Sequence, residues 1–184
     1  MIARMRYITR WGLMRNTDPE NIQEHSHMVA VLAHALAVIQ NEKFGGRVDP
    51  GAVAVAALYH DASEILTGDL PTPIKYDNPD IQGAYKSVET MAEQKLLSML
   101  PEEFRPTYRE ILTIPDPEVR ALVKAADKLS AYIKCVEELK AGNNEFRQAA
   151  AQTRHALEGY GLPEVAYFLE TFLDSFSLTL DELQ

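Results

Sequence analysis

The chain has 184 residues, of which 46% are hydrophobic and 24% are charged, the usual balance of a soluble domain with a sizeable core. Its formal net charge of −9 argues against a long nucleic-acid backbone as a partner, although a small phosphorylated ligand needs only a local positive site. The single cysteine, Cys135, excludes an internal disulfide and fits a reducing cytoplasm. We interpret it as a small apolar helix residue rather than a nucleophile.

No membrane partner is predicted. The longest apolar stretch, Met28–Ile39, has about a dozen residues and contains His34, so it is too short to span a bilayer. The N-terminal stretch Met1–Arg15 carries four arginines and no acid, and it lacks the apolar region of a secretory signal. We therefore expect a cytoplasmic protein.

Helix start and stop signals follow one another along the chain: a capping residue with proline and acid at the start, and glycine at the end. They predict these helices in order: Met1–Trp11, Thr17–Lys43, Asp49–Leu66, Asn78–Leu100, a shorter one from Pro101, Asp116–Ala141, Asn143–Tyr160 and Pro163–Phe176. The two prolines of Asp69–Pro73 exclude regular helix there. No period-two pattern stands out, so the fold is predicted to be all-α, with one domain over residues 1–184.

The stretch Ala52–Glu64 is the centre of the functional argument. Eight apolar or small residues, the last of them Tyr59, run straight into His60-Asp61, and Glu64 follows three residues later. On one continuous helix, His60 and Glu64 would be i, i+4 neighbours and their side chains would project toward one region. Burying such groups is costly unless something pairs with them, and a metal ion would do so. The alternative is an acid pair on a solvated helix face.

Two further residues are candidate metal ligands. His25 lies nine residues before His34, which puts the two on roughly opposite helix faces, whereas His27 and His34 share a face. His25 can therefore point where the other two cannot, and His155, in a polar helix, is expected to be solvated. Asp127 sits in an otherwise apolar helical run, where the alternative is an acid paired with a neighbouring lysine.

The pattern of His25, His60-Asp61 and Asp127 resembles the HD-domain phosphohydrolase superfamily, which holds its metal on an all-helical bundle. The chain is similar, over nearly its whole length, to the bacterial 5′-deoxynucleotidase family. The motifs that carry this resemblance are Arg10-Trp11, Glu24-His25-Ser26, Tyr59-His60-Asp61-Ala62-Ser63-Glu64, Thr67–Pro73, Glu137-Glu138-Leu139 and Ala141–Phe146. The resemblance implies an HD-domain bundle of about seven or eight helices.

The resemblance also implies roles for individual residues. His25, His60, Asp61 and Asp127 would hold one divalent metal, and Glu64 would be the catalytic acid or base. Arg10 would orient the phosphate during catalysis and Trp11 would lie against the deoxyribose. The further substrate-binding residues would be His25, Asp61 and Asp127, together with Asp69, Leu70, Pro71 and Thr72. The family acts on deoxyribonucleoside 5′-monophosphates and is dimeric, so a homodimer is expected.

The chemistry of these residues agrees with such a role. Two imidazoles and two carboxylates suit Co, Mn, Cu, Fe or Zn without choosing among them. Open coordination positions require five or six ligands rather than a closed tetrahedron. Arg10 is the fork-shaped cation that phosphate prefers. No cluster of side chains points to base readout, so the base is expected to be read weakly.

Two other functions compete with the nucleotidase. The first is an HD-type phosphodiesterase or triphosphohydrolase, many of which use a second metal with extra histidines. The helical phase of His27 and His34 argues against that arrangement. The second is a non-catalytic helical module that senses nucleotides, which would be expected to lack Glu64 or one ligand.

Overall fold

The computed structural model describes the backbone of residues 1–75 and 78–183, and the side chains of these residues except 72, 73, 180 and 183. Within these residues the regular elements are all helices, and the single strand-type pairing is an isolated antiparallel bridge between Thr9 and Asn21. The predicted all-α class is therefore confirmed for the described part of the chain. The prediction of one domain stays a prediction.

Seven α-helices of nine residues or more make up the body of the described chain. They are α1 (Ile22–Phe44), α2 (Pro50–Tyr59), α5 (Pro79–Ser98), α6 (Arg105–Thr113), α7 (Pro117–Lys140), α8 (Arg147–Gly159) and α9 (Pro163–Thr171). The short helices are α3 (Glu64–Thr67), α4 (Thr72–Lys75), η1 (Ile2–Tyr7), η2 (Glu102–Phe104), η3 (Asn144–Phe146), η4 (Leu173–Ser177) and η5 (Leu180–Leu183).

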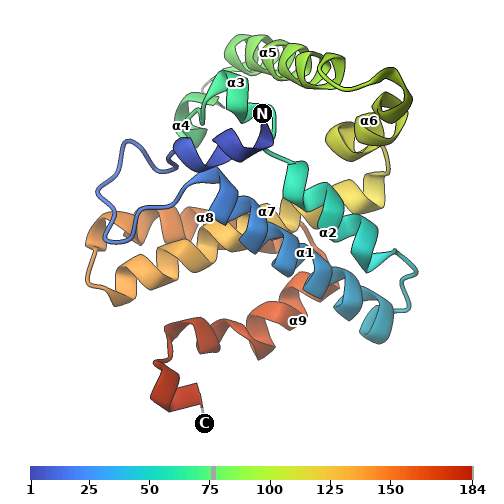
Figure 1. Cartoon of the computed structure of the whole chain (residues 1–184). Helices are drawn as coiled ribbons and strands as arrows, with labels where there is room; N and C mark the ends of the chain where they lie inside the picture. Colours follow the sequence, from blue (N-terminus) through green and yellow to red (C-terminus); the bar gives the residue numbers. More distant parts are fainter. Residues whose placement is uncertain (76–77, 184) are drawn as a thin grey trace.

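The core forms where α1 lies against α2, α7 and α9 (Figure 1). Leu36 of α1, Val53 of α2 and Leu129 of α7 are fully buried there. Burying one such side chain stabilises the fold by about 1.5–3 kcal/mol. This contact between four helices is the frame that carries the residues singled out in the sequence.

Helix α1 begins later than predicted. Its cap is Asn21, whose side chain accepts from the amides of Gln23 and Glu24, while Glu24 reaches back to the Asn21 amide. The predicted start at Thr17 is wrong because the amides of Thr17 and Asp18 are bound by the Glu138 carboxylate of α7 instead. Segment 12–20 is therefore a loop that is anchored on α7.

The helix predicted over Asp49–Leu66 is interrupted. Helix α2 ends at Tyr59, and a tight turn over residues 60–63 leads into the one-turn helix α3. The cause is local: the ring of His60 donates Nδ1–H to the Ala57 carbonyl at 2.8 Å, and the amide of Ala62 bonds back three residues to Tyr59. The single helix that would place His60 and Glu64 one turn apart is therefore a wrong prediction.

The segment Asp69–Pro73 is also only partly as predicted. Asp69, Leu70 and Pro71 are irregular, but Thr72 and Pro73 already belong to α4, because proline is tolerated in the first turn of a helix. The turn before it depends on Gly68, whose backbone has φ 73° and ψ 166°. That region is essentially restricted to glycine, so Gly68 sets the direction in which Asp69 leaves α3.

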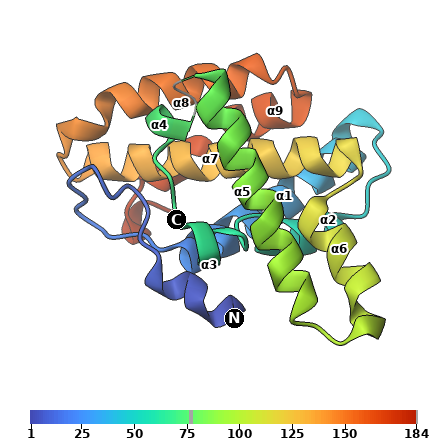
Figure 2. The ribbon, with the colours of Figure 1, turned by 90° about the horizontal axis from the view of Figure 1, so that it is seen from above.

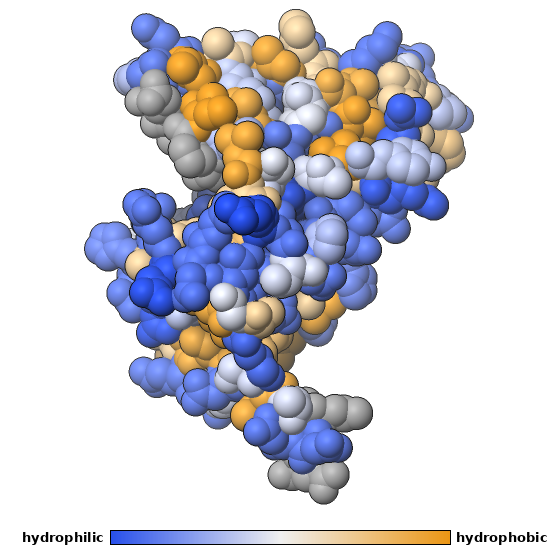
Figure 3. Space-filling model, turned by 90° about the vertical axis from the view of Figure 1, so that its left-hand side faces the viewer, coloured by the Kyte–Doolittle hydropathy of each residue, from blue (hydrophilic) through white to orange (hydrophobic). Residues whose placement is uncertain are grey.

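Helix α5 lies across the top of the molecule, against α3, α4 and α6 (Figure 2). It is poorly covered: its buried residues are Ala92, Leu96 and Leu97, while Val88 and Met91 are exposed. Figure 3 shows apolar surface gathered at the upper end of the molecule, above a mainly hydrophilic middle. Among the described helices, none is both long enough and apolar enough to cross a bilayer.

Candidate active site

Three separate elements bring four of the predicted residues together. His25 comes from the first turns of α1, His60 and Asp61 from the turn after α2, and Asp127 from the middle of α7. The Nε2 atoms of the two imidazoles both face Asp61 Oδ2, His60 at 3.1 Å and His25 at 3.6 Å. Asp127 Oδ1 lies 3.0 Å from His25 Nε2 and 4.0 Å from His60 Nε2. The four side chains thus meet at one point.

These separations suit a single metal ion. Donor atoms held about 2.1 Å from one ion lie about 3.0 Å apart at right angles and about 3.4 Å apart in a tetrahedron. One donor atom each from His25, His60 and Asp61 lies within 4.8 Å of the others. Asp127 stands outside that tighter group, but it approaches both imidazoles.

The hydrogen bonding of His60 suits the predicted role of a metal ligand. Because its Nδ1–H donates to the Ala57 carbonyl at 2.8 Å, Nε2 is the nitrogen that faces the acids. Within the described residues, this buried Nε2 accepts and donates no hydrogen bond, although it is ion-paired with Asp61. An orphaned imidazole nitrogen fixed by a backbone carbonyl on its other side is the arrangement that metal-binding histidines usually show.

The charges at this point are strongly coupled. Burial alone would raise the pKa of Asp61, but the charges of His60 and His25 lower it to about 2. Burial likewise opposes ionisation of Asp127, yet its hydrogen bond to His25 and the nearby histidine charges lower its pKa as well. Burial would lower the pKa of His60, but Asp61 and Asp127 raise it to about 9. The two carboxylates therefore carry negative charge that a divalent cation would balance.

Glu64 lies at the edge of this group. It is buried, and its Oε2 has no hydrogen-bond partner within the described residues. Burial, with the charges of Asp61 and Asp69, raises the pKa of Glu64 to about 9, while Arg10 and Lys75 act in the opposite direction. A buried carboxyl of this kind, aimed at no protein partner, is a typical candidate for a proton donor or acceptor.

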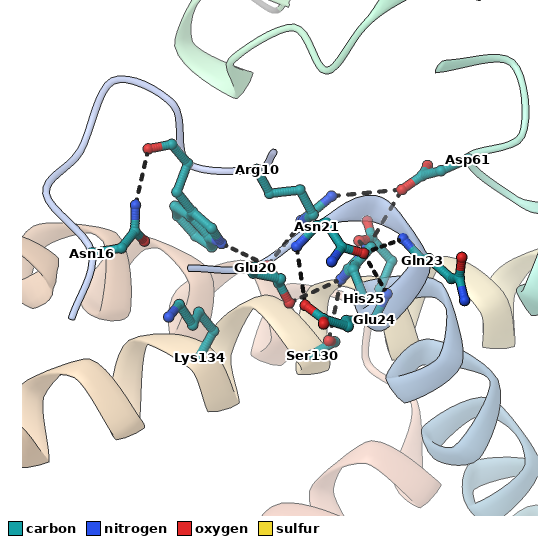
Figure 4. A network of polar contacts seen from close by, with 12 residues as sticks. Arg10, Asn16, Glu20, Asn21, Gln23, Glu24, His25, Asp61, Ser130 and Lys134 are labelled. Carbon is teal, nitrogen blue, oxygen red and sulfur yellow. Dashed lines mark hydrogen bonds and ion pairs between the residues drawn. The ribbon is translucent and has the colours of Figure 1, made fainter. Parts of the chain in front are cut away.

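Arg10 and Trp11 are placed beside the acids by a short backbone pairing. The amide of Arg10 bonds to the Glu20 carbonyl at 2.9 Å, and the amide of Ile22 bonds to the Ile8 carbonyl at 2.9 Å. Arg10 Nη1 reaches to 3.6 Å from Asp61 Oδ2, and its Nε binds Glu20 Oε2 at 3.1 Å. The same Oε2 accepts Nε1–H of Trp11 at 2.9 Å (Figure 4).

Trp11 also has a packing role. Its ring lies 5.2 Å from that of Phe146, centroid to centroid, and its backbone has φ 58°, in the left-handed region that large residues avoid. A strained, half-buried aromatic residue next to a group of ligand-type side chains is typical of a functional position. The packing role of Trp11 is therefore visible in its surroundings, and its contact with a sugar stays a prediction.

The predicted sugar-side segment lies close to the same charges. Asp69, Leu70 and Pro71 are half-buried, and burial raises the pKa of Asp69 while the Arg10 charge opposes that shift. The predicted contact by Thr72 lies outside the described side chains. A hollow of about 210 Å³ opens beside His60 and Asp127, with Lys124 and Arg120 also on its walls.

The other titratable candidates lie elsewhere. His27, His34 and His155 are exposed while His25 is fully buried, so the predicted separation of the histidines by helical phase is confirmed. Cys135 is buried, and burial raises the pKa of its thiol to about 12, which suits the predicted inert role.

Sequence reasoning missed two groups that hold the site. Glu20, which falls within the start of the helix predicted from Thr17, binds Arg10 and Trp11 and faces His25. Ser130 lies 3.3 Å from His25 Nδ1, and its position three residues after Asp127 on α7 was the available signal. No local sequence pattern predicts the contacts of Glu20, because a loop brings its partners Arg10 and Trp11 next to it.

Comparisons with known proteins define the class of this fold. An HD-domain phosphohydrolase from Listeria innocua superposes with a TM-score of 0.83 at 25% identity, covering 95% of this chain and 85% of that one. A cyanophage S-2L HD phosphohydrolase, bound to dA and one catalytic Zn²⁺ ion, superposes with a TM-score of 0.63 at 23% identity, covering 95% of each chain. At that identity the second likeness is one of fold. The predicted HD-domain helical bundle is confirmed.

Sequence comparison is more specific. Residues 1–176 match the family described as 5′-deoxynucleotidase YfbR-like. A 5′-deoxynucleotidase from Vibrio cholerae is 55% identical over 99% of this chain and 95% of its own, and one from Yersinia pseudotuberculosis is 52% identical over 99% and 93%. The chain belongs to the 5′-deoxynucleotidase YfbR-like family, which confirms the family predicted from the sequence.

Proposed function

We propose that this chain is a metal-dependent phosphomonoester hydrolase that converts deoxyribonucleoside 5′-monophosphates to deoxyribonucleosides and phosphate. Membership of the family supports the activity, and one structural observation supports the site. That observation is the convergence of His25, His60, Asp61 and Asp127 beside Arg10 and the buried Glu64.

In this proposal the four converging side chains hold one divalent transition metal. The ion, when bound, supplies charge neutralisation for the phosphate and acidifies a water molecule. The donor set suits Co, Mn, Cu, Fe or Zn alike, so the metal is named only by this class. A metal-binding imidazole must be neutral, so the bound ion would take the place of a proton on Nε2 of His60.

The remaining residues would act on the substrate. Arg10, held between Glu20 and Asp61, has guanidinium N–H groups left to bind phosphate oxygens. Glu64 would take a proton from the attacking water and return one to the leaving 5′-oxygen. Trp11 would lie against the deoxyribose and exclude a 2′-hydroxyl, with Asp69, Leu70, Pro71 and Thr72 on the sugar side and little discrimination between bases.

The active form is proposed to be a homodimer in the cytoplasm. The family resemblance and the exposed apolar residues of α5, among them Val88 and Met91, support self-association. The single cysteine supports a reducing compartment. A mass near 20.6 kDa by light scattering at micromolar concentration would contradict the dimer.

Phosphate release from deoxynucleotides tests the proposed activity. The purified chain would be stripped with chelator, reloaded with each metal, and assayed on dAMP, AMP, dATP and a cyclic nucleotide. Release from dAMP well above that from AMP is the expected result, with rates on the common deoxynucleoside monophosphates within about tenfold, or ~1.4 kcal/mol. Preference for dATP or the cyclic nucleotide would favour the triphosphohydrolase or phosphodiesterase, and no release with any metal would favour the non-catalytic module.

A further inference from the structure

The Glu20 carboxylate touches both halves of the proposed site (Figure 4). Its Oε2 accepts two hydrogen bonds, from Arg10 Nε at 3.1 Å and from Trp11 Nε1 at 2.9 Å. Its Oε1 lies 3.7 Å from Nδ1 of His25, on the ring edge opposite the Nε2 that faces Asp61 and Asp127. One side chain thus links the residues proposed for phosphate and sugar to a proposed metal ligand.

The position of Glu20 is fixed by the backbone on both sides. The antiparallel pairing of residues 8–10 with 20–22 holds it beside Arg10, and the Asn21 cap joins it directly to α1. Upstream, the amides of Thr17 and Asp18 are bound to the buried Glu138 of α7. The carboxylate is only 15% exposed, so it is held in place rather than sampling solvent.

His25 needs an acceptor on its Nδ1 side. A histidine that presents Nε2 to a metal carries its proton on Nδ1, and an acceptor there fixes the ring and increases its basicity. The groups next to this nitrogen are Ser130 Oγ at 3.3 Å and Glu20 Oε1 at 3.7 Å. Of the two, Glu20 alone carries negative charge, and it alone also contacts Arg10 and Trp11.

We propose that Glu20 is a positioning residue that couples the metal ligand His25 to the Arg10–Trp11 pair. This inference rests on the proposed function for the roles of those three residues. Glu20 does not touch substrate or metal. It sets the orientation of the His25 ring, and through its other oxygen it sets where the guanidinium and the indole stand.

Two substitutions separate these contacts. Glu20→Gln can keep both Arg10 and Trp11, because a single amide oxygen at the place of Oε2 accepts both bonds, but it puts an N–H₂ group toward His25 Nδ1–H. Glu20→Ala removes all three contacts. Glu145→Gln is the matched control, because Glu145 binds Arg15 of the same loop and, within the described residues, forms no hydrogen bond or ion pair with the side chains of the proposed site.

Three quantities are measured for each variant, and two of them do not require catalytic turnover. Trp11 is the only tryptophan, so its fluorescence reports the Glu20 contact directly. Affinity for Mn²⁺ or Co²⁺, titrated into chelator-stripped protein, reports the His25 contact. The third readout is kcat/KM on dAMP, with kcat and KM resolved.

For Glu20→Ala we expect a red-shifted emission, a 10–100-fold weaker metal affinity and a fall in kcat/KM of similar size. For Glu20→Gln we expect an unchanged emission with weakened metal affinity.

The inference is overturned if folded Glu20→Ala keeps emission and metal affinity within twofold of the wild type, or if Glu145→Gln reproduces the losses. If Glu20→Ala does not fold, an unchanged metal affinity in Glu20→Gln overturns it. Failure of the proposed function would show as no phosphate release by the wild type, and emission and metal affinity would still decide the role of Glu20.

Discussion

Glu64 combines burial with an unused oxygen, and these two properties decide what it can do. Burial raises the pKa of Glu64 to about 9, with a further contribution from the repulsion of Asp61 and Asp69. A divalent cation at the proposed ligands beside it would oppose that repulsion and lower the pKa of Glu64. An acid or base is most effective when its pKa lies near the working pH.

The expected result of Glu64→Gln follows from that role. Turnover should fall by about 10²–10⁴-fold, the usual loss for a missing acid or base, while the metal content stays near that of the wild type. Metal analysis and dAMP kinetics on the same preparation measure both quantities. A variant that loses its metal would show that Glu64 is a ligand.

Substitutions of Trp11 can distinguish its proposed role in rejecting ribose from its role in packing. Trp11→Ala should raise kcat/KM on AMP relative to dAMP, since an apolar surface discriminates against an added hydroxyl by about 10²-fold. It should also destabilise the fold by roughly 1–3 kcal/mol, because the ring packs on Phe146. Trp11→Phe keeps an aromatic ring, so it should retain most of the discrimination against AMP and most of the stability of the wild type. An unaltered AMP-to-dAMP ratio in a folded Trp11→Ala protein removes Trp11 from the specificity mechanism.

At the level of elements, the end of α7 anchors the loop that carries Trp11 and Glu20. The buried Glu138 accepts hydrogen bonds from the amides of Thr17 and Asp18, the Thr17 hydroxyl and Asn143, and it is paired with Lys134 at 2.5 Å. Lys134 also donates to the Asp18 carbonyl. Burial opposes ionisation of Glu138, but Lys134 and these donors keep its pKa below the ordinary 4.5.

Glu138→Gln should therefore destabilise the protein and change its response to acid. Removing one partner of a buried pair costs about 3–5 kcal/mol, since Lys134 is left without its counter-charge. A lowered pKa stabilises the fold above pH 4.5 and that stabilisation is lost as the pH falls below it, so the variant should be less sensitive to acid than the wild type. Urea unfolding at pH 7 and pH 4 measures this, with Glu137→Gln, on an exposed position of α7, as the control.

The elements also show why sequence reasoning reached some features and missed others. The caps at Asn78 and Asp116 lie next to prolines and act within one turn, so the starts of α5 and α7 were predictable. His25 could be separated from His27 because helical phase is a local property. The break at His60 was not predictable, because it depends on where the His60 ring goes. The ring lies between the Ala57 carbonyl, the neighbouring Asp61 and Asp127 of α7, and Asp127 is distant in the sequence. Glu20 was missed for the same reason, since its partners are ten, nine and five residues away through loop and turn.

On the scale of the whole molecule, the proposed ligands come from positions distant in the sequence. His25, the His60-Asp61 pair and Asp127 belong to three elements that already pack around the core. A metal ion bound to all of them would cross-link α1, the turn after α2 and α7. Its binding to the native state alone stabilises that state by mass action, about 2.7 kcal/mol at a free concentration one hundred times the dissociation constant.

This predicts one tightly held ion per chain and a melting temperature that depends on it. Chelation should lower the melting temperature, and re-addition of the ion should restore it. His60→Ala and Asp127→Ala should contain no tightly bound ion, should show no shift on chelation and should lack activity. His27→Ala is the matched control, because His27 is exposed on the same helix as His25 and should keep the ion and the shift. Since the exposed histidines face away from the site, there is no second set of imidazoles for another ion within the described residues. Elemental analysis that finds two tightly held ions per chain would contradict the mononuclear site.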